Sequence, residues 1–214
     1  MESMTLTLNE VKSNLTTVDF SKLPKPARNK GGRGQLLELA LGIDNSSNLC
    51  DMVDGELKSF TQGESIAVTQ LNHCIPEILK GVSFNNSKVG KKLERTLYVG
   101  FDDNNNFLGS VELNQTTDKE HYKQLEEDYN FICEKIKTAY QLKIPLNQLE
   151  GQPLNRFKEL SYTITGKNKL LQIRTKASKN SKGEYVPEKF NDVILNPNSK
   201  MGFYLCGRFG RELL

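Results

Sequence analysis

Apolar and polar positions in the first part of the chain follow helical spacing. Thr7-Leu8-Asn9-Glu10 has the pattern of a capping box, which predicts a helix starting here with Val11 and Leu15 on its apolar face. The apolar run 36–41 predicts a second, largely buried helix, with Gly42 as its left-handed C-cap. Two helices are therefore expected before the first strand.

Strand-like runs dominate the middle of the chain. Strands are expected at 50–53 and 55–60, joined by a very tight turn at Asp54-Gly55, and again at 66–71. A short helix at 75–79, a hairpin and a long helix follow, and then further strands; their expected ranges are 95–101 with 107–113, 118–139, 160–164, 170–176, 193–195 and 202–206. The mixture predicts an α/β (mixed α+β) fold with a central mixed sheet.

Length and composition fit one globular domain. The 214 residues are enough for a sizeable core, and 26% of them are charged. The apolar runs are too short to cross a membrane, and no signal-peptide core is evident, so a cytoplasmic protein is expected. The cysteines are widely spaced, which predicts reduced, mostly buried thiols; they are Cys50, Cys74, Cys133 and Cys206.

Basic residues gather in three segments. Segment 22–33 carries five cations and no acid, segment 167–182 carries six and no acid, and segment 88–95 carries four against one glutamate. A cleft lined from these segments would suit a polyanion, because phosphate contacts dominate nucleic-acid affinity. Three solvated loops on unrelated faces would give the same count. The distribution favours DNA or RNA as the partner.

The segment Asp51-Met-Val-Asp-Gly-Glu56-Leu-Lys58 carries the candidate chemistry. Two carboxylates can hold Mg²⁺, a hard cation that prefers oxygen ligands. Lys58 lies one strand period beyond Glu56 and so points to the same face, where it can orient or deprotonate an attacking water and offset phosphate charge. Many charged hairpins carry the same short pattern, so the context must decide between a nuclease site and a solvated hairpin.

Glu38 interrupts the apolar run of the second predicted helix. A buried carboxylate is costly unless it meets a cation or a hydrogen-bond donor. Glu38 is therefore either an exposed helical residue or a third acidic group facing the metal. The local pattern supports both equally.

Four blocks in the same order resemble the MutH-type DNA endonucleases, which include the methyl-directed mismatch-repair nickase and the Sau-type GATC restriction enzymes. The blocks are Asn29-Lys30-Gly31 with Gly34-Gln35-Leu36-Leu37-Glu38, then Asp51 with Glu56-Leu57-Lys58, then Lys92-Leu93-Glu94-Arg95-Thr96-Leu97, and last Leu171–Ala177 with Gly202-Phe203-Tyr204-Leu205. The resemblance runs from about residue 29 to the C-terminus and leaves the first 25 residues unmatched.

The resemblance implies a restriction-endonuclease-like core, with a catalytic lobe at about 1–115 and a recognition lobe at about 116–214 around a DNA cleft. It implies Mg²⁺ as the cofactor, held by Asp51, Glu56 and Glu38. It implies that Lys58 serves the water and that Lys30 and Lys92 contact the scissile region. Four residues would meet DNA in the recognition lobe; they are Arg174, Lys176, Gly202 and Tyr204.

Departures from the family pattern leave alternatives open. Cys50 stands where the family usually has proline, and the gap from Asp51 to Glu56 is short, so Asp54 is a fallback ligand. Thr175 replaces a usual proline, which leaves methylation sensing open. Segment 180–190 is either a DNA-contacting or a solvated loop.

The function expected from these residues is a type II restriction enzyme that cuts double-stranded DNA at GATC or a related short site. Such an enzyme would act as a monomer or dimer on DNA and would have a cognate methyltransferase in the same system. One alternative is a mismatch-repair nickase that acts on hemimethylated GATC with a MutL-type partner. The other is a non-catalytic DNA-binding protein of the same fold.

Overall fold

The computed structural model describes residues 6–23, 30–43, 48–149, 152–153, 162–179, 185–187 and 200–214. The chain divides into two compact units, and each of them is assembled from separate segments. Unit 1 comprises residues 1–66, 91–119 and 207–214, and unit 2 comprises residues 67–90 and 120–206. A division of labour into catalytic and recognition lobes stays a prediction.

Unit 1 is built on a mixed sheet with the strand order β1-β3-β4. The strands are β1 (Glu56–Thr61), β3 (Arg95–Phe101) and β4 (Phe107–Asn114). β1 runs parallel to β3, with Glu56 opposite Thr96, and β3 and β4 form the expected antiparallel hairpin. The parallel pair brings residues near 56 and near 95 to one end of the sheet.

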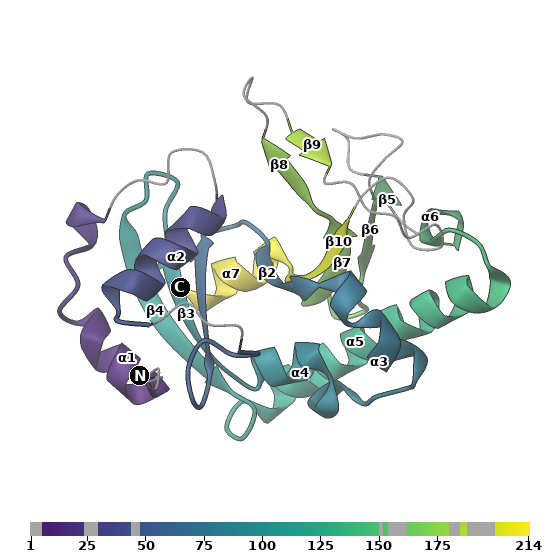
Figure 1. Ribbon diagram of the computed structural model, residues 1–214, viewed down its shortest axis with the longest axis horizontal. Coiled ribbons are helices and arrows are strands. Elements are labelled where there is room, and N and C mark those ends of the chain that lie inside the picture. Colours follow the sequence, from purple (N-terminus) through teal and green to yellow (C-terminus); the bar gives the residue numbers. More distant parts are fainter. Residues whose placement is uncertain are drawn as a thin grey trace. The chain divides into compact units, whose positions relative to one another are not determined.

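Helices cover both faces of this sheet (Figure 1). α1 (Leu8–Leu15) and α2 (Lys30–Ala40) share a buried apolar cluster with Leu57 and Leu97, and the short helix η1 (Phe20–Lys22) packs beside it. On the other face α7 (Gly207–Leu213) sets Phe209 against Tyr98, with ring centroids 5.4 Å apart. The face that carries Tyr98 also carries Glu56 and Lys58, because side chains alternate along a strand.

Unit 2 contains a second sheet with the strand order β2-β10-β7-β6-β5. Its β10–β7, β7–β6 and β6–β5 pairs are antiparallel. The strands are β2 (Ile66–Gln70), β5 (Gln152–Pro153), β6 (Tyr162–Thr165), β7 (Leu171–Thr175) and β10 (Met201–Leu205), and a separate hairpin pairs β8 (Ala177–Lys179) with β9 (Tyr185–Pro187). The helices are η2 (Leu71–His73), α3 (Ile75–Leu79), η3 (Phe84–Asn86), α4 (Lys88–Leu93), α5 (Lys119–Leu142) and α6 (Leu146–Leu149). Two of them cross a unit boundary, since α4 ends in unit 1 and α5 begins there.

The long helix α5 is the main support of unit 2. Its Tyr129 packs between Phe84 and Phe203, with centroids 5.4 and 5.9 Å away. Its Asp128 is fully buried and accepts main-chain N–H groups of Leu170 and Leu171 at 2.8 and 2.9 Å. The helix therefore holds the start of β7 through both apolar packing and a buried carboxylate with several donors.

The sequence predicted most elements in their right places, including the capping box of α1 and the helix 75–79. The strand at 50–53 was wrong: these residues form bends and a turn, with only a single bridge between Met52 and Gly55. The expected burial of the second helix was also wrong in part, because Leu37 is fully buried while Leu39 is 75% exposed. The strand expected at 193–195 lies outside the described residues.

The cysteine prediction is confirmed, since all four thiols are free and all but the half-buried Cys50 are buried. None of the helices in the described part of the chain combines the length and the apolar character needed to span a membrane.

Candidate functional site

The first strand of unit 1 brings an acid and a base together. Glu56 and Lys58 lie two residues apart on β1 and so share a face, as predicted. Glu56 is completely buried, and Lys58 Nζ donates a hydrogen bond to its Oε1 over 2.5 Å. A fully buried carboxylate needs a cation or hydrogen-bond donors, and Lys58 provides both.

Lys92 reaches the same carboxylate oxygen from another part of the chain. It lies at the end of α4, and its Nζ donates to Oε1 of Glu56 over 2.8 Å. The Lys92 carbonyl accepts a hydrogen bond from Thr96 Oγ1, and Thr96 pairs with Glu56 in the sheet. Both lysine side chains are largely enclosed, with 16% and 17% of their surface exposed.

Asp51 meets Glu56 through reciprocal contacts. The Asp51 main-chain N–H donates to Glu56 Oε2 over 3.2 Å, while the Leu57 N–H donates to Asp51 Oδ2 over 3.1 Å. Partial burial raises the pKa of Asp51, and the neighbouring Glu56 charge raises it further. The structure therefore brings the two predicted acidic residues together although Asp51 lies outside any strand.

Glu38 belongs to the same acidic cluster. Its carboxyl is half-buried on α2, and burial is the main cause of its raised pKa, followed by the charge of Asp51. Lys58 and Lys92 act in the opposite direction on this pKa. Glu38 is therefore half-buried rather than exposed, and its role as a third acidic group facing the metal stays a prediction.

The acidic cluster, defined as Glu38, Asp51 and Glu56, fits a divalent cation in its chemistry. It offers hard carboxylate oxygens, the donors that Mg²⁺ prefers. Its members also repel one another, since acidic neighbours and burial raise the pKa values of Glu38 and Asp51 while Lys58 and Lys92 offset part of this rise. Within the described ranges, no three His, Cys, Asp or Glu side chains are placed to enclose a metal ion as they stand. The ammonium groups of Lys58 and Lys92 pair with the Glu56 carboxylate.

One further candidate residue, Asp54, has its partners away from the acidic cluster. The Asp54 carboxylate, the fallback ligand, accepts a hydrogen bond from the Leu8 N–H over 2.7 Å and pairs with Arg95. The structure gives this fallback no support, because these partners belong to α1 and the start of β3 rather than to the acidic cluster. Lys30 begins α2, but its side chain lies outside the described part of the structure.

Sequence reasoning missed Cys50 as a neighbour of the acidic cluster. Burial raises the pKa of its thiol, and Glu56 and Asp51 raise it further. The Cys50 Sγ–H donates to the Lys91 carbonyl, with 3.7 Å between sulfur and oxygen. Its position directly before Asp51 is the only signal in the sequence that places it here.

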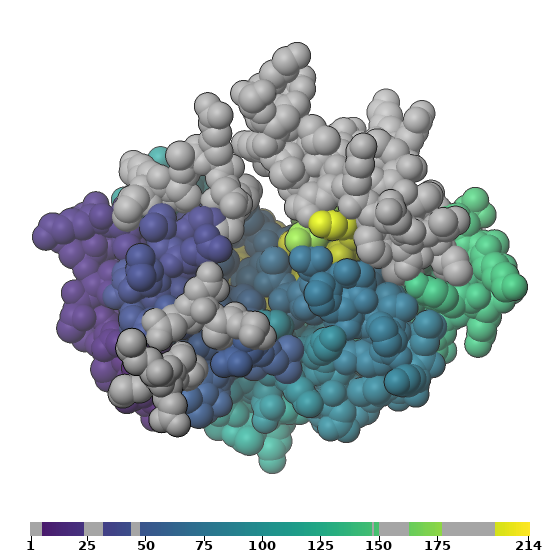
Figure 2. Space-filling view, viewed as in Figure 1, coloured from purple at the N-terminus to yellow at the C-terminus, as the bar shows by residue number. Residues whose placement is uncertain are grey.

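Three of the predicted DNA-contacting residues of unit 2 lie on the neighbouring strands β7 and β10, and Lys176 directly follows β7. Yellow atoms of residues 200–214, the range that includes β10 and α7, reach the surface in Figure 2. Arg174 on β7 pairs with Gly202 on β10, and its guanidinium lies 5.6 Å from the ring centroid of Tyr204. An added Cβ at Gly202 would lie 3.7 Å from the Lys176 side chain. The four residues therefore form one group, with a cation stacked on an aromatic ring.

Comparison of the chain with protein-family models gives no match, and comparison with curated proteins gives no significant match either.

Proposed function

We propose that this protein is a Mg²⁺-dependent, sequence-specific DNA endonuclease. The observation that carries the proposal is the cluster in unit 1: Glu56 Oε1 accepts hydrogen bonds from Lys58 and Lys92, the Asp51 N–H donates to Glu56 Oε2, and the charges of Asp51 and Glu56 raise the pKa of Glu38. Such a combination of carboxylates and lysine suits metal-assisted phosphodiester hydrolysis. The order of the four sequence blocks that resemble MutH-type endonucleases supports the same reaction.

In this proposal Glu38, Asp51 and Glu56 would hold Mg²⁺, which would supply Lewis-acid chemistry at the scissile phosphate. Lys58 orients the attacking water and offsets charge on the phosphate. Lys92, which donates to the same Glu56 oxygen as Lys58, contacts the scissile region. The products would carry 5′-phosphate and 3′-hydroxyl ends.

Arg174, Lys176 and Tyr204 are proposed to contact double-stranded DNA. Arginine and lysine read guanine edges or clamp phosphates, and an aromatic ring offers a stacking surface. The proposed target is GATC or a related short site, cut by a restriction enzyme that has a cognate methyltransferase. A nickase that works with a MutL-type partner uses the same site chemistry.

The test is digestion of unmethylated, hemimethylated and fully methylated plasmid by the purified protein with Mg²⁺, followed by sequencing of the ends. Lys58→Ala should abolish cleavage and leave DNA affinity nearly intact. Linear fragments with one terminal motif would indicate a restriction enzyme, whereas slow nicking accelerated by a MutL-type protein would indicate a repair nickase. No cleavage with Mg²⁺ or Mn²⁺ would reject the enzyme.

A non-catalytic DNA-binding protein is the second candidate, and one observation favours it. Glu56 already has two ammonium partners, so the buried carboxylate is satisfied without a metal. Specific DNA binding by the wild type, unaffected by EDTA and without any cleavage, would support this candidate.

A further inference from the structure

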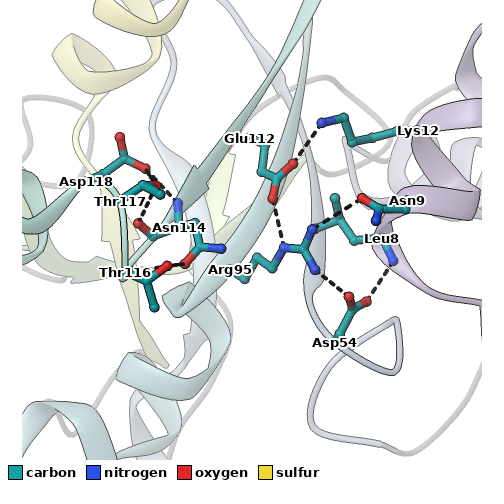
Figure 3. Close-up of polar contacts among 10 residues, drawn as sticks. All are labelled: Leu8, Asn9, Lys12, Asp54, Arg95, Glu112, Asn114, Thr116, Thr117 and Asp118. Atoms are coloured by element: carbon teal, nitrogen blue, oxygen red, sulfur yellow. Dashed lines mark hydrogen bonds and ion pairs between the residues drawn. The ribbon is translucent and has the colours of Figure 1, made fainter.

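A second polar network in unit 1 ends on the turn that separates Asp51 from Glu56 (Figure 3). Its centre is Arg95, the first residue of β3. One guanidinium nitrogen of Arg95 pairs with Asp54 in the turn, and Nε donates to Glu112 Oε1 on β4 over 2.7 Å. Arg95 therefore fastens the turn to the sheet.

Helix α1 supplies the rest of this network. Its first N–H, that of Leu8, donates to Asp54 Oδ1 over 2.7 Å, and its Lys12 pairs with Glu112 over 2.8 Å. Arg95 also donates to Asn9 Oδ1 over 3.3 Å. An N–H at the start of a helix has no partner within the helix, so the Asp54 carboxylate acts as its acceptor from a distant segment.

Backbone packing leaves this turn little freedom. The Val53 N–H donates to the Leu6 carbonyl over 3.0 Å. A Cβ added to Gly55 would lie 2.8 Å from both the Arg95 carbonyl and the Leu8 side chain. The turn therefore cannot shift without moving α1 or the start of β3.

Both ends of the turn enter the acidic cluster. Asp51 precedes it and Glu56 follows it, and Lys92 lies three residues before Arg95 in the chain. We propose that Asp54 and Arg95 are positioning residues, and that α1 together with them sets the geometry of Asp51 and Glu56. The catalytic part of this inference rests on the proposed endonuclease function, while its geometric part does not. It assigns a role to an N-terminal segment that the sequence left without one.

The experiment compares Asp54→Ala with Asp118→Ala, a matched control in the same unit. Asp118 also accepts a main-chain N–H, that of Asn114, over 2.8 Å, and a Thr117 hydroxyl over 2.9 Å, but its network is confined to the turn after β4 (Figure 3). Loss of either aspartate removes a comparable turn contact. Asp54→Asn and Arg95→Lys serve if the alanine variant does not fold.

The first readout is amide hydrogen exchange of Leu57, whose N–H donates to Asp51. We expect exchange to be about tenfold faster in Asp54→Ala and unchanged in Asp118→Ala, since only the first loosens the turn locally. The second readout is cleavage: kcat should fall roughly 10- to 100-fold in Asp54→Ala, with KM for DNA within about twofold, because small misplacement of reacting groups is costly.

Equal Leu57 exchange in Asp54→Ala, Asp118→Ala and the wild type would overturn the inference, whether or not the protein cuts DNA. Wild-type cleavage by Asp54→Ala would also overturn it. Faster Leu57 exchange in a protein whose wild type never cuts would reject the endonuclease proposal and support the positioning of the carboxylates.

Discussion

Lys92→Met is the substitution that most directly tests the electrostatics of the acidic cluster. The substitution removes one of the two ammonium groups beside the acidic cluster and replaces the lysine side chain with an apolar side chain of similar length. At the observed 2.8 Å, a unit pair attracts with about 6 kcal/mol at an effective dielectric constant near 20 and about 1.5 kcal/mol at that of water. The cost of desolvating Lys92 offsets part of this attraction.

The expected loss in the free energy of unfolding is therefore roughly 1.5–3 kcal/mol in metal-free buffer at pH 7. For a chain of this size this corresponds to a fall in Tm of about 3–12 °C. The assay is urea and thermal unfolding in EDTA, with Lys91→Met as the control, since Lys91 is the exposed neighbour on the same helix. Added Mg²⁺ should restore part of the loss.

A double-mutant cycle shows whether Glu56 is the partner of Lys92. In a Glu56→Gln background, Lys92→Met should cost at least about 1 kcal/mol less than in the wild type, because residues in contact are not additive. An equal cost in both backgrounds, or a cost no larger than that of Lys91→Met, would refute the reasoning.

Three further predictions concern pH, thiol reactivity and recognition. Glu38→Gln should raise the free energy of unfolding at pH 7 in EDTA and lose this advantage near pH 4. The raised pKa of Glu38 means that the folded state binds more protons than the unfolded state at pH values above the usual 4.5, so wild-type stability falls as pH rises through this window. Urea titrations at several pH values would show this fall. A thiol reagent at pH 8 should label Cys50 first, because it is half-buried whereas Cys74, Cys133 and Cys206 are buried, which raises their pKa values to about 12. Peptide mass spectrometry gives the order, and early labelling of Cys74 would contradict it. Arg174→Ala should cost about 1–3 kcal/mol at a cognate site if the guanidinium contacts a base edge, whereas an equal loss on random DNA, measured by fluorescence anisotropy, would mark a phosphate contact.

The elements that the sequence predicted well are those in which neighbouring residues determine the structure. α1 starts where Thr7 and Glu10 cap each other, and both contacts lie within four residues of the chain. Glu56 and Lys58 share a face for the same local reason. Burial of the second helix was harder to predict, because an unbroken apolar run does not show which side of the helix meets a neighbour; Leu37 does so and Leu39 does not.

Contacts between distant segments account for the partners of Asp54 and Lys92. Asp54 was a fallback ligand on sequence grounds, since it lies between the two acids. Its actual partners are 46 and 41 residues away, at Leu8 and Arg95, and no local pattern points to them. Lys92 was found only through the resemblance, because its approach to Glu56 depends on the parallel pairing of β1 with β3.

Long-range contacts also shape the short turn between Asp51 and Glu56. A regular hairpin would direct its backbone N–H groups into a ladder between the two strands. Here the Asp51 N–H donates to the Glu56 side chain and the Val53 N–H donates to the Leu6 carbonyl, so neither is available for such a ladder. Because buried N–H groups need acceptors, these partners satisfy the hydrogen bonding of the two N–H groups in an irregular turn as fully as a strand would. The turn can then bring two carboxylates together although the bridge between Met52 and Gly55 does not continue into a ladder, while Asp54 pairs with Leu8 of α1 and with Arg95.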